Sequence, residues 1–434
     1  MSFECSRLED VAEVIDSLHK TPSYCAQGFP MVRVTDVKYG NLNLSGCHSV
    51  DEGTYLEFSR RFKPKAGDIV ITRVGTYGVS ARVKEAKFCL GQNTAAIIPK
   101  LINPRYLYAA LNSEFVRSQI ESGVVGSTQK TLSLKHIKAL NIPRQGDETE
   151  ESIAETIGGL DDRISLLRET NATLEAIAQT LFKSWFVDFD PVRAKAEGLE
   201  PEGMDAATAA LFPDSFEESE LGMVPKGWIA STLNDVSDVG IGKTPPRKEA
   251  HWFSKSSADI QWVSIRDMGG SSAFLTDTSE YLTTDAVSRF NVRRVPKNTV
   301  MLSFKMTIGR VAITSSEMTT NEAIAHFKLT DKSPLTSEYI YLYLRNFDYS
   351  TLSSTSSIAD AVNSKIVREI PILVPGAGVA AEFQRTVSVI FERIKKVQLQ
   401  SQSLTSLRDT LLPRLISGRL CLLEAEADTE VVCA

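Results

Sequence analysis

Residues 157–185 read IGGLDDRISLLRETNATLEAIAQTLFKSW, and residues 387–415 read VSVIFERIKKVQLQSQSLTSLRDTLLPRL. Apolar side chains recur in both segments at the heptad spacing that is typical of paired helices. Each heptad position of the first segment, from Ile157 to Trp185, has an apolar counterpart 230 residues later, from Val387 to Leu415, and the polar interruption is repeated as Asn171 and Ser401. The chain is therefore predicted to contain two similar halves, each ending in a long helix.

The apolar positions are expected to form a seam between the two helices. At about 1.5 Å per residue, each helix would be some 50 Å long, and such a seam needs a partner. Packing of each helix on its own globular domain is one solution, but equal length and register favour antiparallel pairing of the two helices. The residues predicted to pair are Ile157, Leu160, Ile164, Leu167, Leu174 and Leu181 with Val387, Ile390, Ile394, Val397, Leu404 and Leu411.

The remainder of each half shows short strand-like runs separated by turn signals. Small motifs recur in the same order, such as Lys20-Thr-Pro22 with Lys243-Thr-Pro245 and Thr76-Tyr-Gly78 with Thr307-Ile-Gly309. The predicted fold class is α+β, with two β-rich α/β domains separated by two long antiparallel coiled-coil helices in an internal pseudo-two-fold repeat. The predicted boundaries are 1–147 for the first domain, 148–186 for the first helix, 187–227 for a linker, 228–376 for the second domain, 377–418 for the second helix and 419–434 for an acidic tail.

The net charge of −6 is distributed unevenly along the chain. Residues 1–147 contain 19 basic and 14 acidic residues, whereas residues 148–227 contain 6 basic and 18 acidic residues. The acidic total therefore does not exclude a polyanionic partner for the first domain. The acidic first helix and linker suggest instead a surface that faces a protein partner, with Glu148, Glu150 and Glu151 as its first candidates.

No targeting or membrane signal stands out in this sequence. The first residues show no basic segment followed by an apolar one, and no run approaches the roughly 18–20 apolar residues of a membrane helix. The six cysteines form no CxxC pair, which favours reduced thiols over a disulfide framework. A cytoplasmic protein without a membrane association is expected.

The usual templates of enzyme active sites fail. Val239-Gly-Ile-Gly-Lys-Thr244 resembles the end of a phosphate-binding loop, but the required glycine is replaced by Ser237, and Pro245 and Pro246 exclude the helix that should follow. Asn103-Pro-Arg-Tyr106 only partly matches the Asn-Pro-Pro-Tyr signature of adenine methyltransferases, and the five histidines lack metal-ligand spacing. We expect no catalytic residue, no metal and no cofactor bound by this chain.

A binding architecture remains. Two globular domains held at fixed separation could read two half-sites on one DNA duplex, because points about one helical turn apart, roughly 34–36 Å, present the same groove on the same side.

Four segments carry a resemblance to a known family. They are Ile157-Gly-Gly-Leu-Asp-Asp-Arg-Ile164, Leu181-Phe-Lys-Ser-Trp-Phe-Val-Asp-Phe-Asp-Pro191, Leu221-Gly-Met-Val-Pro-Lys-Gly-Trp228 and Leu411-Leu-Pro-Arg-Leu-Ile-Ser-Gly-Arg-Leu420. In this order and spacing, and with two variable domains each followed by a similar helix, the chain resembles the specificity subunit of type I restriction–modification enzymes.

This resemblance implies a non-catalytic subunit that recognises a bipartite, asymmetric DNA sequence, one half with each target-recognition domain. It also implies that the partners are double-stranded DNA, two methyltransferase (modification) subunits and two ATP-dependent restriction subunits that translocate DNA. S-adenosylmethionine, ATP and Mg would then be bound by the partner subunits. Methylation requires the adenine to be flipped out of the duplex, so this chain would only position the DNA.

Candidate DNA contacts are basic, amide and aromatic residues in loops beside the expected strands. Arginine pairs with guanine and glutamine with adenine, whereas most lysines contact phosphate. In the first domain the candidates are Lys20, Tyr24, Arg33, Lys38, Arg73, Tyr77, Gln129 and Lys130, and in the second they are Lys243, Arg247, Lys248, Trp252, Arg266, Lys305 and Arg310.

Two other functions remain open at this point. A stand-alone regulator could dimerise through its coiled coil, although a duplicated chain already supplies both halves of such a dimer. A specificity subunit could also serve a system that only methylates, without restriction partners.

Overall fold

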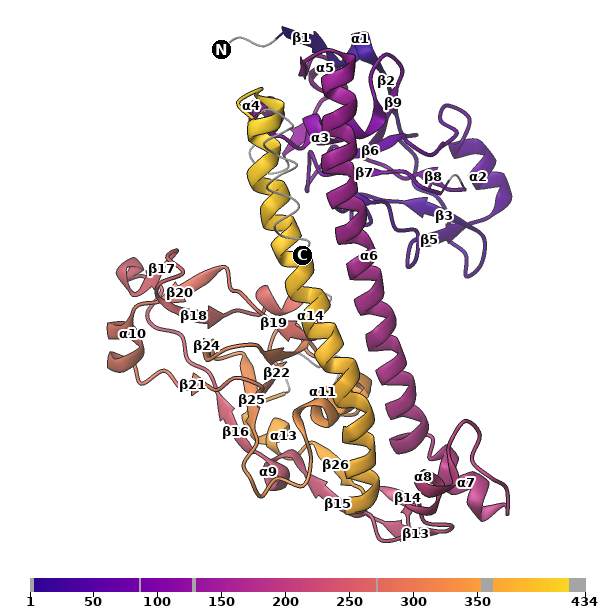
Figure 1. Ribbon diagram of the computed structural model, residues 1–434, viewed down its shortest axis with the longest axis vertical. Helices are drawn as coiled ribbons and strands as arrows, with labels where there is room; N and C mark the ends of the chain where they lie inside the picture. Colours follow the sequence, from indigo (N-terminus) through magenta and orange to yellow (C-terminus); the bar gives the residue numbers. More distant parts are fainter. Residues whose placement is uncertain (1–3, 86, 127–129, 271, 353–361, 421–434) are drawn as a thin grey trace. The chain divides into compact units, whose positions relative to one another are not determined.

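The computed structural model describes residues 4–85, 87–126, 130–270, 272–352 and 362–420 (Figure 1). The chain divides into two compact units, of which the first comprises Met1–Leu167 with Gln400–Ala434 and the second comprises Arg168–Leu399. Two helices of 40 residues each, α6 (Asp147–Phe186) and α14 (Ala377–Ile416), contribute a segment to both units. The acidic tail was predicted for residues 419–434, of which 421–434 lie outside the described residues.

The first unit contains a five-stranded sheet in the order β2-β9-β6-β7-β4 and a three-stranded sheet in the order β5-β3-β8. The central strand β6 reads Ile-Val-Ile-Thr, and all four side chains are buried, as suits β-branched residues in a covered sheet. The strands are β1 Glu4–Arg7, β2 Ala12–Asp16, β3 Phe29–Val32, β4 Gly40–Asn41, β5 His48–Val50, β6 Ile69–Thr72, β7 Ser80–Arg82, β8 Cys89–Leu90, β9 Thr94–Pro99, β10 Val124–Val125, β11 Thr131–Leu132 and β12 Asn141–Arg144.

Short helices flank these sheets. Helix α3 begins where Asn103 accepts hydrogen bonds from the backbone amides of Arg105 and Tyr106, with Pro104 in its first turn. The segment that partly matched a methyltransferase signature is therefore a helix cap, built from the residue types that caps prefer. The helices are α1 Leu8–Val11, α2 Glu52–Phe58, α3 Pro104–Leu111, α4 Glu114–Ser122 and α5 Leu134–Lys138.

The second unit repeats this topology. Its first five-stranded sheet has the order β16-β25-β22-β23-β19, and its second has the order β17-β20-β18-β24-β21, in which β20, β18 and β24 correspond to β5, β3 and β8. The strands are β15 Ile229–Thr232, β16 Asp238–Ile241, β17 Phe253–Ser254, β18 Ile260–Val263, β19 Phe274–Leu275, β20 Glu280–Leu282, β21 Arg294–Val295, β22 Val300–Ser303, β23 Val311–Thr314, β24 Met318–Thr320, β25 Ile324–Lys328 and β26 Pro371–Val374. The helices of this domain are α9 Leu233–Val236, α10 Thr284–Arg289, α11 Ser337–Asn346 and α13 Ser364–Arg368.

The strands that the two domains share agree in direction as well as in order, whereas β17 and β21 extend the second sheet of the second domain only. The edge strands β4 and β19 pair in parallel with β7 and β23, and the terminal strand of each domain, β1 or β15, pairs antiparallel with the last one, β12 or β26. The predicted repeat of a mixed α/β domain is therefore confirmed.

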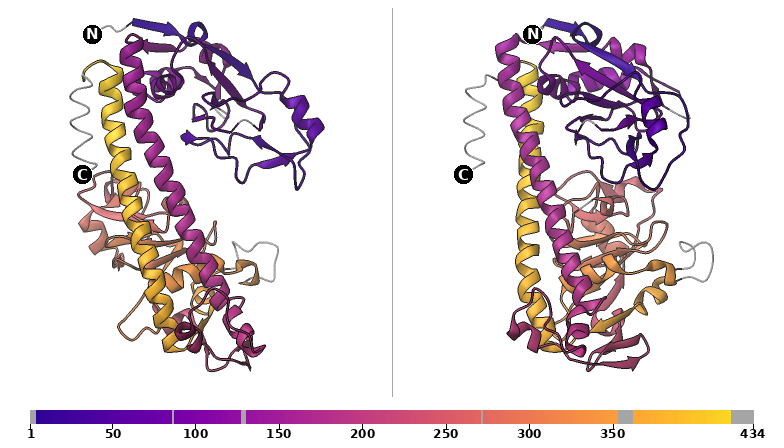
Figure 2. Two further views of the ribbon diagram at one scale, coloured as in Figure 1. Left: turned by 45° about the vertical axis from the view of Figure 1, so that its right-hand side comes forward. Right: turned by 90° about the vertical axis from the view of Figure 1, so that its right-hand side faces the viewer.

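Within each unit, the segments of α6 and α14 run antiparallel and lie side by side (Figure 2). In the first unit, Gln145 donates to the carbonyls of Leu415 and Ile416, and Asp161 pairs with Arg408 at 2.9 Å. In the second unit, Asn171 donates to the Ile394 carbonyl at 3.2 Å. Of the residues predicted to pair, Leu174, Leu181 and Ile390 are partly buried and the rest are buried.

The segment predicted to be a linker is folded in this structure. Residues 187–227 contain α7 (Asp190–Ala196), α8 (Ala206–Ala210) and a hairpin of β13 (Phe216–Ser219) with β14 (Gly222–Pro225). The side chains of Val192 and Phe212 are buried in the core of the second unit. The Ala, Glu and Pro content of residues 187–227 is typical of a flexible connector. The few buried residues of this segment nevertheless suffice to fold it.

Helix α6 is joined to the second domain through a buried carboxylate. Glu175 accepts hydrogen bonds from the Ala273 amide at 3.1 Å and from the Tyr341 hydroxyl at 3.3 Å. The Gln398 side chain on α14 donates to the Phe274 carbonyl at 2.7 Å, next along the same edge strand. Burial raises the pKa of Glu175 above its usual value of 4.5. None of the helices among the described residues is long and apolar enough to cross a membrane.

We predict that Glu175→Gln stabilises the second unit increasingly as the pH rises. The raised pKa means that the fold favours the neutral acid, so this contribution is fully present below the unfolded pKa of about 4.5 and is lost as the pH rises through the folded value. Glutamine keeps an acceptor for the Ala273 amide without the cost of burying a charge. All four tryptophans lie in the second unit, so urea unfolding followed by their fluorescence between pH 4.5 and 8 measures the effect.

The exposed Glu169 on the same helix provides the control, since Glu169→Gln should change the free energy of unfolding by less than about 0.5 kcal/mol. A difference between Glu175→Gln and the unmodified chain that does not vary with pH would contradict the prediction.

Candidate nucleic-acid interface

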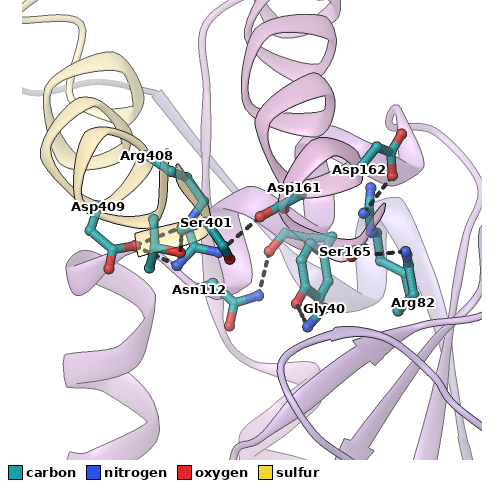
Figure 3. A network of polar contacts seen from close by, with 12 residues as sticks. Gly40, Arg82, Asn112, Asp161, Asp162, Ser165, Ser401, Arg408 and Asp409 are labelled. Atoms are coloured by element: carbon teal, nitrogen blue, oxygen red, sulfur yellow. Dashed lines mark hydrogen bonds and ion pairs between the residues drawn. The ribbon is translucent and has the colours of Figure 1, made fainter. Parts of the chain in front are cut away.

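The first domain is held on helix α6 by charged side chains (Figure 3). Asp162 pairs with Arg82 of β7 and with Arg105 of α3, each at 2.9 Å. The Arg82 side chain is only 9% exposed, so the pair with Asp162 compensates a charge that is held largely away from water. A Cβ at Gly158 would lie 2.9 Å from the Arg105 guanidinium, so the Arg105 side chain passes close to the helix backbone at this point.

Neighbouring polar contacts extend the same attachment. The side-chain amide of Asn41 donates to the Ser165 hydroxyl of α6 at 3.2 Å, and the backbone amide of Gly40 donates to the Tyr108 hydroxyl at 2.6 Å. Arg408 of α14 reaches Asp161 from the other side (Figure 3). These contacts fix the sheet of the first domain relative to the helix segments of its own unit, which a domain that reads DNA requires.

Each domain presents one hairpin loop that is closed in the same way. In the first domain, the loop between β6 and β7 is closed by the Gly78 amide, which donates to the Thr72 carbonyl at 2.8 Å. In the second domain, the loop between β22 and β23 is closed by the Gly309 amide, which donates to the Ser303 carbonyl at 3.1 Å. Three of the sequence-predicted contacts, Arg73, Tyr77 and Lys305, lie in these loops, and Arg310 ends the second of them.

The loop of the first domain brings Arg73, Tyr77 and Lys130 together. The Lys130 ammonium lies 5.8 Å from the centre of the Tyr77 ring, and the Gly75 amide donates to the Lys130 carbonyl at 3.2 Å. Arg73 itself is 12% exposed and forms an ion pair with Asp16, so it holds the loop in place rather than projecting from it. Gln129 lies outside the described residues.

A second group in the first domain surrounds His48, which the sequence reading had not selected. Arg33 lies 3.1 Å from the His48 ring nitrogen and also pairs with Asp36, which holds the pKa of Arg33 above its usual value. The Tyr24 ring meets the His48 ring edge-on at 4.6 Å and is 46% exposed. Lys20 is elsewhere paired with Glu57 at 2.5 Å, and Lys38 is exposed.

Residues 33–36 form a turn after β3, closed by the Asp36 amide, which donates to the Arg33 carbonyl at 3.0 Å. The corresponding turn after β18, residues 264–267, is closed in the same way but has different side chains. Ser264 replaces Arg33 there, and its amide donates to Asp267 at 2.8 Å as the Arg33 amide donates to Asp36. Arg266 in this turn is exposed. Arg310 donates to the Ile265 carbonyl at 2.7 Å and so ties the end of the hairpin loop to this turn.

The remaining candidates of the second domain differ in their contacts and in their exposure. Arg247 lies over the rings of Phe253 and Trp262 at 4.2 and 4.5 Å and pairs with Glu280. Trp252 is 5% exposed and donates to Glu249, so its ring belongs to the core and is not available to stack on a base. Lys243 and Lys248 are exposed.

The glycine-rich segment before Lys243 also has a structural role. Gly242 follows strand β16, and a Cβ there would lie 2.2 Å from the Asn321 carbonyl oxygen. A close approach of two backbones therefore explains this glycine, and the described residues include no group of His, Cys, Asp or Glu that could hold a metal ion.

The comparison with known families decides the identity. The type I restriction modification DNA specificity domain matches residues 2–176 and again residues 225–407. The chain belongs to the type I restriction–modification DNA specificity family. The two matches follow the internal repeat described above.

Curated relatives agree with this family. The chain is 30% identical over 366 residues to the type I restriction enzyme HindI specificity subunit of Haemophilus influenzae, covering 74% of this chain and 78% of the relative. It is 25% identical over 438 residues to the MjaIX specificity subunit of Methanocaldococcus jannaschii, covering 96% and 93%. The predicted resemblance, and with it the role of a specificity subunit without an active site of its own, is confirmed.

A solved structure shares the fold. The S subunit of a type I restriction–modification system from M. genitalium aligns over 96% of both chains with a TM-score of 0.52 and 15% sequence identity. At this identity the likeness concerns the fold alone.

We predict that Asp162→Asn loosens the first recognition domain. Loss of the charge leaves the buried Arg82 without its partner and should cost roughly 1–3 kcal/mol, discounted because Asp162 is 36% exposed. Tryptophan fluorescence does not report on this unit, so hydrogen exchange of peptides from β6 and β7 measures the effect as faster exchange. Asp188→Asn, which breaks an exposed pair with Lys183, is the matched control and should cost less than about 0.5 kcal/mol. Equal exchange in both variants would show that the network does not stabilise the domain.

Proposed function

We propose that this specificity subunit binds a bipartite, asymmetric DNA site, with the first recognition domain reading one half and the second reading the other. The observation that carries the proposal is the repeat itself. Both domains have a five-stranded sheet of the same strand order and the same closed hairpin loop, but different side chains occupy equivalent positions, as Arg33 and Ser264 illustrate. Two copies of one scaffold with different surfaces are suited to two different half-sites.

The unspecific spacer between the half-sites would follow from the two long helices. Each has 40 residues and is therefore about 60 Å long, and we infer that antiparallel coiled-coil pairing in a pseudo-two-fold arrangement keeps the separation constant. Asn171, buried in the seam with one bond to the Ile394 carbonyl, is the kind of polar residue that fixes register between paired helices.

The chain would act in a complex. Two methyltransferase subunits would carry S-adenosylmethionine and methylate one adenine in each half-site, and two restriction subunits would use ATP and Mg to translocate and cleave DNA in the cytoplasm. The acidic surface remains a candidate for partner binding, but Glu150 is buried, where it pairs with Arg144 at 2.7 Å. Glu148 is exposed and is the better residue with which to test that surface.

A side chain that contacts DNA must be accessible, so the exposed side chains among the candidates are the better ones. Tyr24, Lys38, Tyr77 and Lys130 in the first domain, and Lys243, Arg247, Lys248, Arg266 and Lys305 in the second, lie in loops and are exposed or partly exposed. Five candidates have a structural partner, so their substitution would affect folding and binding together: Lys20, Arg33, Tyr77, Arg247 and Arg310.

A methylation-only system would use the same recognition. The stand-alone regulator is not favoured, because the family and the relatives are specificity domains and subunits of restriction systems.

Half-specific variants test the proposal. A library of randomised duplexes is selected with the full chain in complex with its methyltransferase subunits, and the bound sequences are determined. Tyr24→Ala should relax the preference only at positions of one half-site, and Arg266→Ala only at positions of the other, with about 1–3 kcal/mol lost per contacted base pair.

Arg163→Ala, which removes an exposed positive charge from helix α6, is the control and should leave both halves unchanged. Variants that relax the same positions, or positions in both halves, would contradict a division of recognition between the two domains.

A further inference from the structure

The hairpin loop of the second domain places an apolar side chain in solvent. Met306 lies in this loop, beside Lys305, and is 83% exposed. A single exposed apolar residue is common on protein surfaces, so the exposure of Met306 does not by itself indicate a function. The backbone conformation of this residue is unusual as well.

Met306 has a φ of +61°, in the left-handed region that glycine and asparagine favour. Among the described residues other than glycine with a positive φ, Asn93, Asn291 and Asn298 are of the tolerant type. Phe189 is compensated by packing, because its ring contacts Phe216 and Trp228 at 6.1 and 5.8 Å between centroids. Met306 has the strain without comparable burial.

The loop around Met306 contains several internal hydrogen bonds. The Ser303 hydroxyl donates to the Thr307 carbonyl at 2.6 Å and accepts from the Arg310 amide at 3.1 Å, and the Thr307 amide donates to the Lys305 carbonyl at 2.6 Å. A Cβ at Gly309 would lie 3.0 Å from the Tyr349 ring, so this ring supports the end of the loop. The exposed methionine therefore projects from a loop that is held by hydrogen bonds and by the Tyr349 ring.

The first domain shows what the loop looks like without this feature. Gly75 occupies the equivalent position, with a φ of +74°, and a positive φ costs glycine little. The scaffold thus accepts glycine at this point, and the second domain carries a strained, exposed methionine instead. Strain of this kind persists at functional sites, where the side chain is needed in one orientation.

We propose that Met306 is a wedge that inserts between two base pairs of the half-site read by the second domain, and that it kinks the duplex there. Apolar side chains such as Met and Leu act in this way in DNA-bending proteins, where partial unstacking is offset by the additional contacts of a bent duplex. Lys305 beside it would contact a phosphate next to the opened step. Because Gly75 has no side chain, the first domain would leave its half-site stacked.

This inference rests on the proposed function and adds a contribution from DNA deformability to it. Base steps that unstack easily, such as TA and CA, would be preferred at the wedge without any hydrogen bond to the bases. Met306 would therefore be a specificity-determining residue that reads stiffness rather than base edges.

Four variants of the full chain, in complex with its methyltransferase subunits, test the wedge. Met306→Ala and Met306→Gly should bind the specific site roughly tenfold more weakly while binding nonspecific DNA as before. Met306→Leu, which keeps the volume, should bind the site as the unmodified chain does. Met223→Ala, at a methionine 60% exposed in the β13–β14 hairpin, is the matched control and should change nothing.

Thermal unfolding separates a wedge from a structural role. Met306→Gly relieves the positive φ, so it should raise the Tm of the second unit by roughly 2–4 °C although it weakens DNA binding. A residue that merely stabilised the loop would lower both. Scanning 2-aminopurine through the half-sites should show one unstacked step beside the second domain, apart from the methylated adenine, and this signal should vanish in Met306→Ala.

Three results would overturn the wedge. These are specific binding by Met306→Ala equal to that of the unmodified chain, a joint loss of Tm and binding in Met306→Gly, and weaker assembly with the methyltransferase subunits while the assembled complex binds DNA normally. The last result would make Met306 a protein contact. If the unmodified complex bound no specific sequence at all, the proposed function would fail before the wedge was tested.

Discussion

Burial of the apolar seam on α6 and α14 is the interaction on which the rest of the structure depends. Neither helix can expose this seam to water, and within each unit a segment of one is covered by an antiparallel segment of the other. Both units are therefore built around the same pair of helices, although each has its own sheets. Within each unit, the paired helix segments give the recognition domain an element to which it is attached.

The two attachments use different chemistry at equivalent places. In the first domain, the Gly40 amide donates a hydrogen bond to the Tyr108 hydroxyl. In the second domain, the amide of its counterpart Ala273 donates to the carboxylate of Glu175 on α6. The first domain adds the Asp162 ion pairs instead. Duplicated scaffolds can thus keep their topology while the polar contacts that orient them diverge, and the same holds for the loops that would meet DNA.

The helices could be predicted closely from the sequence, because heptad periodicity is a local property. Residues 148–186 were expected for the first helix, and Asp147–Phe186 is observed. The repeat of the domains was also visible, through short motifs in constant order. The folded segment 187–227 was missed, since its few buried residues, such as Phe212, are hidden in a composition typical of linkers.

Individual contact residues were much harder to predict, because their roles depend on partners that are distant in sequence. Arg73 and Trp252 have the residue types that bind DNA, yet Asp16 and the core of the second domain hold them. His48 beside Arg33 gave no local signal, and Met306 could be recognised only from its backbone conformation. Residue type suggests a function, but burial and pairing decide whether a side chain is available for it.

Single-molecule methylome sequencing is the most direct test of whether the two domains divide the recognition of one DNA site. The DNA would come from cells that express this chain with its neighbouring modification subunit, compared with cells that express the modification subunit alone. We expect one new motif with two defined halves separated by an unspecific gap, and one methylated adenine on each strand. A continuous motif, or no new methylation despite expression of both subunits, would contradict it.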